Sequence, residues 1–358
     1  MNKGNLKRIF YLARTTLPYL KPAKVRNLLL CELEIRRRTV QQASMPYVSL
    51  VDVTDVCNLR CPYCPTGRNQ DSGRPVRVIP LDIMRRFLDE MAPHLVSINL
   101  FNWGEPFIHP HIAEIVSMCH QRNLCVTISS NLSVAFTKRI LATCEAGLDY
   151  LIVSLSGIRQ ETYARYHKGG HLDRVIANTK AIVEWRKRLG RSRPFIEWKY
   201  LLFKHNTGEV QACEALADGL GVDIFRVKTG GGPEEVCVGD DQDPAASNCP
   251  ELWRMAVLSA DGGIPGCCYL YWKHDDFGEM WERTVAQVRG GERFVQGRRL
   301  FNPEESSLLP PNLDHPCLKC YRVHNQPHLK RFLTENSRAK EGHRTGAPYP
   351  YPKRENGP

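Results

Sequence analysis

Six apolar, β-rich runs alternate with amphipathic stretches from residue 47 onward, and this alternation limits the fold more than any other feature. We expect strands at 47–54, 95–102, 123–129, 149–155, 195–203 and 222–228. We expect helices at 81–92, 110–121, 136–146, 171–189 and 207–220. Strands that alternate with helices form a parallel sheet with crossover connections. The prediction is therefore an α/β fold, a partial (β/α)6 TIM-like barrel.

The rest of the chain divides into shorter segments around this barrel. With 358 residues, the chain can hold one large barrel domain and a smaller module. Residues 46–235 are assigned to the barrel, and the run Gly230-Gly231-Gly232-Pro233 is interpreted as a linker to a small module at 236–330. Residues 331–358 are expected to form a mobile polar tail.

Residues 1–45 form a basic N-terminal extension. They carry ten Lys or Arg against only Glu32 and Glu34, within a chain of net charge +11. Apolar residues such as Ile9, Ala13 and Leu17 recur at near-helical spacing. A basic amphipathic helix of this kind can dock on a membrane surface or on a protein partner. We favour the alternative, in which its apolar side packs on the chain's own barrel.

Cysteine usage and hydropathy indicate a cytoplasmic location. Fourteen Cys in 358 residues are too few for a disulfide scaffold. The chain opens with Met1-Asn2-Lys3-Gly4 instead of an apolar signal segment, and no stretch approaches eighteen apolar residues. We therefore expect a cytoplasmic protein, with attachment to the membrane periphery through residues 1–45 left open.

Cys57, Cys61 and Cys64 stand close together with the spacing C-x3-C-x2-C. A 4Fe-4S cluster has four irons that each need a terminal ligand, and thiolates are the usual donors. Three local thiolates leave one iron open. A structural zinc site is the alternative, but it needs four protein ligands, and no fourth Cys or His lies near Cys64.

Polar residues follow the carboxyl ends of the predicted strands, which meet at one mouth in a barrel of this type. The cysteine triplet follows the first strand, and Gly104-Glu105-Pro106 and Ser129-Ser130-Asn131 end the next two. Ser154 and Ser156 end the fourth. Loop capping by Ser and Asn is the simpler explanation for each cluster alone, but their convergence predicts an active site.

The cysteine spacing, with the aromatic Tyr63 before Cys64, resembles the signature of the radical S-adenosylmethionine (SAM) superfamily. The resemblance implies that Cys57, Cys61 and Cys64 hold a 4Fe-4S cluster whose fourth iron is chelated by SAM. In this family the reduced cluster cleaves SAM to a 5'-deoxyadenosyl radical, which abstracts hydrogen from an unactivated carbon. Tyr63 is expected to pack on the adenine.

Other motifs at the mouth extend this resemblance to the cofactor-binding residues. Gly104-Glu105-Pro106 resembles the Gly-Gly-Glu motif, with Trp103 in place of the first Gly, and implies contact with the SAM ammonium. Ser129 and Asn131 resemble the segment that contacts SAM near its methionine and ribose. Ser154 and Ser156 resemble a Ser-x-Asp-Gly run, with Ser156 where Asp is common.

Lys199 and Arg226 are charged residues inside apolar strands. Burial of an unpaired charge is costly. Both are therefore candidates for binding an anionic ligand such as the SAM carboxylate, or for an active-site base. The simpler explanation is that both side chains lie on the solvent-facing side of their strands, where side chains alternate between the two faces of a sheet.

A second cysteine set lies beyond residue 235 and resembles the auxiliary-cluster modules called twitch and SPASM. The implied ligands of a second 4Fe-4S cluster are Cys249, Cys267, Cys317 and Cys320, with Cys268 as the alternate to Cys267. Residues 269–316 contain no Cys, so one cluster of the twitch type is expected. A structural zinc site with the same four thiolates is the alternative.

These features predict a radical SAM oxidoreductase that acts on a small polar, carbohydrate- or cyclitol-like substrate. An external electron donor such as a flavodoxin or ferredoxin is expected to reduce the first cluster. A peptide-modifying radical SAM maturase is the alternative. A non-enzymatic iron-sulfur or zinc protein that binds nucleic acid is disfavoured, because it needs no polar clusters at a barrel mouth.

Overall fold

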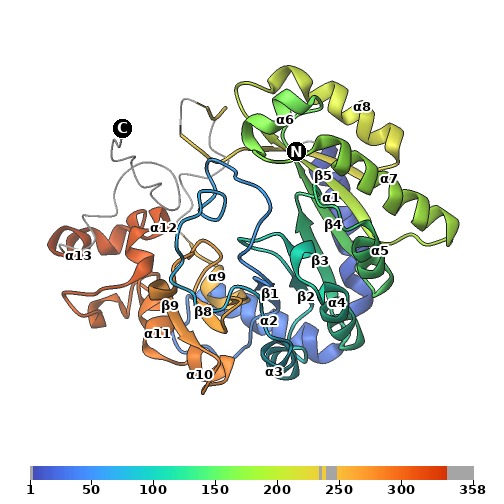
Figure 1. The fold of residues 1–358 in the computed structure, drawn as a ribbon. Coiled ribbons are helices and arrows are strands. Elements are labelled where there is room, and N and C mark those ends of the chain that lie inside the picture. The colour runs from blue at the N-terminus through green and yellow to red at the C-terminus, as the bar shows by residue number, and fades with distance from the viewer. Residues whose placement is uncertain (1–2, 234–235, 239–247, 337–358) are drawn as a thin grey trace.

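The protein folds around a parallel seven-stranded sheet (Figure 1). The computed structural model describes residues 3–233, 236–238 and 248–336. The strands follow one another across the sheet in the order β6-β5-β4-β3-β2-β1-β7. They are β1 (Val48–Val51), β2 (Ser97–Asn99), β3 (Cys125–Ser130), β4 (Tyr150–Leu155), β5 (Phe195–Leu202), β6 (Ile224–Thr229) and β7 (Met255–Leu258). The predicted α/β fold with a partial TIM-like barrel is confirmed.

The seventh strand, β7, was not predicted, since we expected the barrel to end before residue 236. β7 pairs in parallel with β1, from Val48↔Met255 to Val51↔Leu258. Its four residues form a short apolar run, which periodicity alone cannot assign to a strand. The C-terminal part of the chain therefore contributes directly to the main sheet.

Helices cover the outer face of the sheet, on the right in Figure 1. Alternate strand residues, such as Leu151, Val153 and Trp198, join the apolar sides of these helices in one buried cluster. The short helix α6 was not among the helices expected from periodicity, because its seven residues give too little of it; only the family resemblance implied a helix after the Ser154–Gly157 run. The helices are α3 (Leu81–Met91), α4 (Ile112–Gln121), α5 (Thr137–Glu145), α6 (Gln160–Tyr166), α7 (Leu172–Arg188) and α8 (Val210–Leu220).

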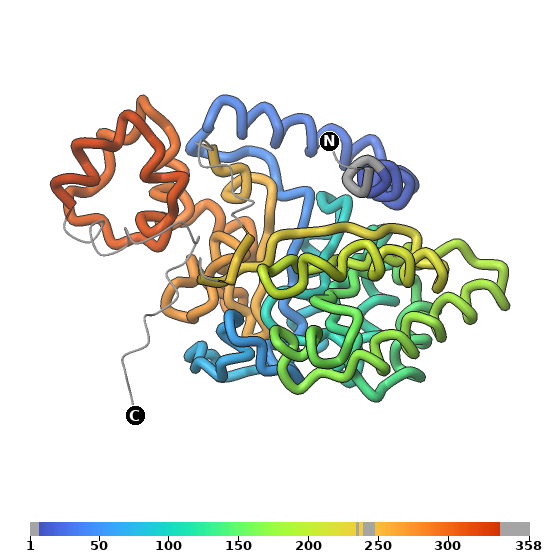
Figure 2. Tube along the Cα trace, turned by 90° about the horizontal axis from the view of Figure 1, so that it is seen from above, coloured from blue at the N-terminus to red at the C-terminus, as the bar shows by residue number. Residues whose placement is uncertain are grey.

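The inner face of the sheet packs against the N-terminal helix α1 (Lys3–Thr16). Tyr11 places its ring centroid 4.7 Å from that of Phe195, and Arg8 Nε lies 3.2 Å from Glu197 Oε2. The basic extension thus packs on its own barrel, as we favoured. Helix α2 (Pro22–Arg37) follows, and both helices lie on one side of the molecule (Figure 2). No helix among the described residues is long and apolar enough to cross a membrane.

The C-terminal elements form the left side of the molecule in Figure 1. A two-stranded antiparallel ribbon joins β8 (Gly263–Pro265) to β9 (Asp276–Glu279). The helices there are α9 (Glu251–Arg254), α10 (Val285–Arg289), α11 (Glu292–Arg299), α12 (Tyr321–His324) and α13 (Lys330–Glu335). Helix α13 occupies the start of the segment expected to be a tail, and residues 337–358 of that segment lie outside the described residues.

Candidate active site

The cysteine triplet lies on the loop between β1 and α3, and this loop turns tightly. The Leu59 N–H lies 3.4 Å from Cys57 Sγ, and the Cys64 N–H donates to the Cys61 carbonyl at 3.2 Å. Gly67 passes directly behind Cys61, where an added Cβ would lie 2.5 Å from the Cys61 nitrogen. Gly67 is therefore a site residue that the sequence prediction did not include.

The three thiols favour their protonated form in the absence of a cation. Burial, and next the Glu105 carboxylate, raise the pKa of Cys57 to about 12. Burial, and next the Cys64 and Cys57 thiols, raise the pKa of Cys61, and burial raises that of Cys64. Iron binds the thiolate, so binding a cluster here must displace protons.

The three thiols of the triplet could in principle bind a single metal ion or an iron-sulfur cluster. Within the part of the chain that the structure describes, no three His, Cys, Asp or Glu side chains are grouped to hold a metal ion. A cubane binds each thiolate through a different iron, so its ligands stand farther apart than those around one ion. The Cys64 and Cys57 sulfurs lie near enough to Cys61 to raise the pKa of its thiol beyond the effect of burial, and the three thiols would supply three of the four terminal ligands that a cubane needs.

Glu105 lies behind Cys57 and joins the ends of β2 and β3. Its carboxylate accepts hydrogen bonds from Ser130 Oγ at 2.8 Å, from the Asn131 N–H at 2.8 Å and from the Phe107 N–H at 3.1 Å. Burial raises the pKa of Glu105 to about 7. Both carboxylate oxygens are engaged by protein donors, so the expected contact with the SAM ammonium stays a prediction.

Asn131 connects this carboxylate to the cysteine loop. Its Nδ2 donates to Asn58 Oδ1 at 3.0 Å and lies 3.8 Å from Cys57 Sγ. Asn58 Nδ2 in turn donates to the Ser133 carbonyl at 2.9 Å. The structure thus brings the predicted residues Glu105, Asn131 and Cys57 together and adds Asn58 to them.

Gly104 has no room for a side chain. An added Cβ would lie 1.9 Å from the Thr54 carbonyl oxygen, at the start of the cysteine loop. The N–H groups of Trp103 and Gly104 donate to Asp52 Oδ1 at 3.2 and 3.5 Å. Pro106 then begins a short 3-10 helix, Pro106–Ile108. The Gly-Glu-Pro backbone therefore supports the loop that carries the cysteines.

Ser154, Lys199 and Arg226 form one row across β4, β5 and β6 on the inner face. Arg226 Nε donates to Glu197 at 2.7 Å, so its charge is paired. No hydrogen bond or ion pair joins Lys199 to another described residue. Burial, and next Arg226, lower the pKa of Lys199 to about 8. Lys199 is therefore the unpaired cation of this row.

Ser156 is bonded to protein groups at the end of β4. Its Oγ lies 2.6 Å from His167 Nδ1 and donates to the Tyr163 carbonyl at 3.1 Å. Tyr163 stacks on His167 with 4.7 Å between ring centroids. Ser156 thus anchors helix α6, whereas Ser129 and Ser154 lie half-buried on the inner face.

Tyr63 belongs to an aromatic group with Tyr166 and Phe203, at centroid distances of 6.2 and 6.5 Å. Added Cβ atoms on Gly232 and Gly230 would lie 2.8 Å from the Tyr63 ring and 2.2 Å from the Phe203 ring. The glycine run interpreted as a linker therefore packs on this aromatic group and cannot carry side chains there.

Residues 51–186, which contain this loop and its supports, match the family model described as the radical SAM superfamily. These residues form a radical SAM domain. The family implies a 4Fe-4S cluster and SAM, and its members are enzymes. The match covers the triplet, Glu105, Asn131 and the β4 end, but not the second cysteine set.

Known relatives resemble this chain over part of their length. It is 26% identical over 187 residues, 51% of each chain, to the tungsten-containing aldehyde ferredoxin oxidoreductase cofactor-modifying protein of Pyrococcus furiosus. It is 26% identical over 163 residues to the PqqA peptide cyclase of Bradyrhizobium diazoefficiens, covering 44% of this chain and 40% of the cyclase. The chain spans about half the length, or less, of these curated relatives.

The fold is similar to that of Streptococcus suis SuiB, solved bound to the precursor peptide SuiA. The TM-score is 0.59 at 13% identity, over 76% of this chain and 70% of SuiB. At this identity the comparison shows a shared fold alone.

The second cysteine set lies outside the matched radical SAM domain. Burial, and next the Cys267 and Cys320 thiols, raise the pKa of Cys249. Burial, and next Cys249, Cys320 and Cys267, raise that of Cys317. The four cysteines therefore lie near one another although they come from distant segments. Cys267 is among the thiols that act on the others, whereas Cys268 lies against Cys267.

Arg74 joins the cysteine loop of the radical SAM domain to the C-terminal ribbon. Its Nη1 lies 2.8 Å from Asp261 Oδ1 and 2.7 Å from Asp276 Oδ2, and its Nη2 lies 2.8 Å from Asp276 Oδ1. The Lys273 N–H also donates to the Ser72 carbonyl at 2.9 Å. These contacts hold the two cysteine-bearing parts of the chain together.

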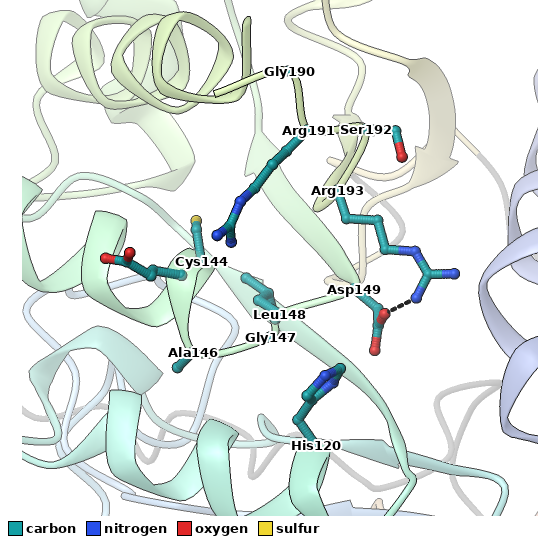
Figure 3. A pocket seen from close by; sticks show the side chains of 11 residues that line it. His120, Cys144, Ala146, Gly147, Leu148, Asp149, Gly190, Arg191, Ser192 and Arg193 are labelled. Carbon is teal, nitrogen blue, oxygen red and sulfur yellow. Dashed lines mark hydrogen bonds and ion pairs between the residues drawn. The ribbon is translucent and has the colours of Figure 1, made fainter. Parts of the chain in front are cut away.

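A pocket of about 430 Å³, which none of the predicted cluster cysteines lines, lies at the amino ends of β4 and β5 (Figure 3). Asp149 and Arg193 form an ion pair there. The Asp149 carboxylate also accepts hydrogen bonds from Tyr19 Oη at 2.8 Å and from the Val126 N–H at 2.9 Å. The Asp149 carboxylate is thus satisfied by protein groups, and we assign the pocket no role in the reaction.

Proposed function

We propose that this chain is an enzyme that reductively cleaves SAM and abstracts hydrogen from an unactivated C–H bond of a substrate at the barrel mouth. Cys57, Cys61 and Cys64 would hold the 4Fe-4S cluster. When bound, the cluster and SAM supply the 5'-deoxyadenosyl radical chemistry. The observation that carries this proposal is the hydrogen-bonded path from Glu105 through Asn131 to the region of Cys57.

Each step of that path has a physical role. The buried Glu105 carboxylate holds the backbone of Asn131, and the Asn131 amide then orients Asn58 and approaches the Cys57 sulfur. Hydrogen bonds to a cluster sulfur ligand tune reduction potential. The chain thus offers a rigid, water-poor support for a ligand set that is one thiolate short.

Lys199 would bind an anionic group of SAM or of the substrate. An unpaired ammonium inside a protein gains more from an anion than a solvated one does, because the local dielectric constant is low. Arg226, the other proposed catalytic residue, is paired with Glu197 and would act by holding that buried carboxylate in place. Tyr63, Gly104, Pro106, Ser129, Ser154 and Ser156 complete the proposed cofactor-binding set.

A second 4Fe-4S cluster would bind to Cys249, Cys267, Cys317 and Cys320 in a module of the twitch type. Cys249 is buried and the other three cysteines are half-buried. Burial and, after it, thiols that include Cys267 and Cys320 raise the pKa values of both Cys249 and Cys317, which supports this proposal. A four-thiolate zinc site remains the competing assignment. As an electron acceptor, the second cluster would make net oxidation of the substrate a natural outcome.

The proposed substrate is small, polar and carbohydrate- or cyclitol-like. Helices α1 and α2 pack on the chain's own sheet and strand ends instead of forming a separate peptide-binding domain. The PqqA peptide cyclase and the peptide-bound SuiB favour a peptide as the second candidate. A cytoplasmic flavodoxin or ferredoxin is the proposed electron donor.

Anaerobic reconstitution with iron and sulfide tests the cofactor assignment. We expect about eight irons per chain and formation of 5'-deoxyadenosine from SAM. Cys57→Ala should abolish SAM cleavage, whereas Cys213→Ala, at a buried thiol of α8, should not. Cys249→Ala/Cys267→Ala should lower the iron content to about four. An unchanged iron content in that variant would refute the second cluster.

Substrate class is tested by adding candidate compounds to the reconstituted enzyme. We expect cyclitols or aminoglycosides to stimulate 5'-deoxyadenosine formation, and Lys199→Met to lower the response. Stimulation by peptides alone would replace the small-substrate proposal with the peptide one.

A further inference from the structure

Helices α1 and α2 lie at the top of Figure 2, and several of their large apolar side chains are exposed to solvent. Of twelve large hydrophobic side chains that the described residues expose, six lie between residues 9 and 33. Leu17 and Leu29 are each 62% exposed and Phe10 is 60% exposed. The remaining six are scattered along the chain from Phe136 to Leu308. Six such residues on two consecutive helices are more than the single, scattered apolar side chains that are normal on a protein surface, which favours an interaction surface here.

The exposed residues recur with the period of a helix. In α2, Arg26, Leu29, Leu30, Leu33 and Arg37 are exposed and lie on one face, at spacings of three and four. Lys24, Cys31 and Ile35 on the opposite face are buried. Helix α2 thus has apolar residues on two sides. One side is buried against the rest of the chain, and the other is exposed to solvent.

The charge around this face has one sign. Exposed basic residues border it on both helices. Between residues 7 and 37 the only acidic residues are Glu32 and Glu34, and neither is fully exposed. Glu32 accepts a hydrogen bond from Tyr47, and the buried Glu34 accepts one from the Ser44 hydroxyl. The basic residues are Lys7, Arg14, Lys21, Arg26, Arg36 and Arg37.

We propose that the α1–α2 face, defined by Ile9, Phe10, Leu17, Leu29, Leu30 and Leu33 with its basic border, docks on an anionic phospholipid bilayer. A membrane interface accepts apolar side chains, and its anionic headgroups attract Lys and Arg. A protein partner would have to match both the apolar side chains and a surround that has basic but no fully exposed acidic side chains. The inference is independent of the reaction proposed above, since none of these residues belongs to the cysteine sites.

Vesicle flotation of the reconstituted full chain tests the proposal. Binding should occur on phosphatidylcholine vesicles with about 30% phosphatidylglycerol and be much weaker on phosphatidylcholine alone. Arg26→Gln/Arg36→Gln/Arg37→Gln should weaken binding by about 100-fold, and added salt should weaken it in the unmodified protein. Leu29→Ser/Leu30→Ser/Leu33→Ser should abolish it while leaving helical content and SAM cleavage unchanged.

Leu189→Ser/Leu308→Ser is the matched control, because it removes two exposed leucines from other surfaces and should leave vesicle binding intact. No binding to either vesicle, or equal loss in the control, would overturn the proposal. Concentration-dependent dimerisation that the triple leucine variant abolishes, without vesicle binding, would assign the face to a second copy of the chain.

Discussion

The guanidinium of Arg74 forms a two-pronged ion pair with the carboxylate of Asp276, 202 residues further along the chain. Arg74 stands on the cysteine loop of the radical SAM domain and Asp276 on the C-terminal ribbon. Both side chains are nearly inaccessible to solvent. Any movement between the two proposed cluster-binding regions would have to separate this pair.

We therefore predict that Arg74→Met destabilises the fold by about 3–5 kcal/mol, because it leaves the Asp276 and Asp261 carboxylates buried without their guanidinium. Urea denaturation measures the change. Arg85→Met is the control: the Arg85–Glu114 pair is exposed, and its loss should cost less than about 1 kcal/mol. Equal losses in both variants would contradict the assigned role of Arg74.

Replacing Glu105 with Gln should weaken the hydrogen bonds that support the cysteine loop. A Gln amide cannot accept at both oxygen positions, so Ser130 or Asn131 loses an acceptor, at a cost of about 1–3 kcal/mol. With Asn131 less well held, SAM cleavage should fall about 10- to 100-fold. The exposed Glu114→Gln variant should change neither measurement. Wild-type activity in Glu105→Gln would show that the path to Cys57 is dispensable.

Gly104→Ala should be more damaging than its size implies. The new methyl group would collide with the Thr54 carbonyl, so the backbone must shift, at a cost of about 1–3 kcal/mol or more. In contrast, Gly219→Ala in α8 meets no atom within 4 Å and should stabilise the protein by about 0.5–1 kcal/mol. Thermal unfolding of the two variants should therefore shift in opposite directions.

We predict that the buried His167 makes the folded protein less stable in acid. Burial, and next Lys199, lower its pKa to about 3, whereas an unfolded His titrates near 6.5. Between these values the unfolded chain binds the proton and the folded chain does not, so stability falls as the pH falls through this window. His167→Gln removes that contribution. As the pH is lowered from about 7.5 to about 5, the unfolding free energy of His167→Gln minus that of wild type should rise by about 2 kcal/mol.

Urea titrations of wild type and His167→Gln at both pH values check this prediction. Other histidines titrate in both proteins, so only the difference between the two proteins is informative. A difference that is the same at both pH values would show that His167 takes up a proton in the folded state.

Features that depend on local spacing were predictable from the sequence. The cysteine triplet is recognised from the spacing of three nearby residues. Strands and helices are recognised from apolar patterns over a few residues, so the six strands of the barrel were found with small shifts at their ends. Strand β7 was not, because its four apolar residues acquire a partner only through tertiary pairing with β1. Helix α6 was likewise too short to show a period.

The roles of individual polar residues were less predictable, since they depend on which neighbours the fold supplies. Arg226 gains Glu197 as a partner, whereas Lys199, beside it, gains none among the described residues. Ser156 finds His167 and Tyr163 within the protein. Nothing in the spacing of Asn58 or Gly67 distinguishes them from ordinary loop residues, although both support the triplet.

The pairing of β7 with β1 has a consequence for synthesis of the chain. Ser49 in β1 bonds to Ala256 in β7 across 207 residues, so the strand that leads into the cysteine loop stays unpaired on one edge until most of the polypeptide has left the ribosome. An open strand edge is prone to pair with other chains. Nascent or truncated chains that stop before residue 255 should therefore depend on chaperones to stay out of aggregates.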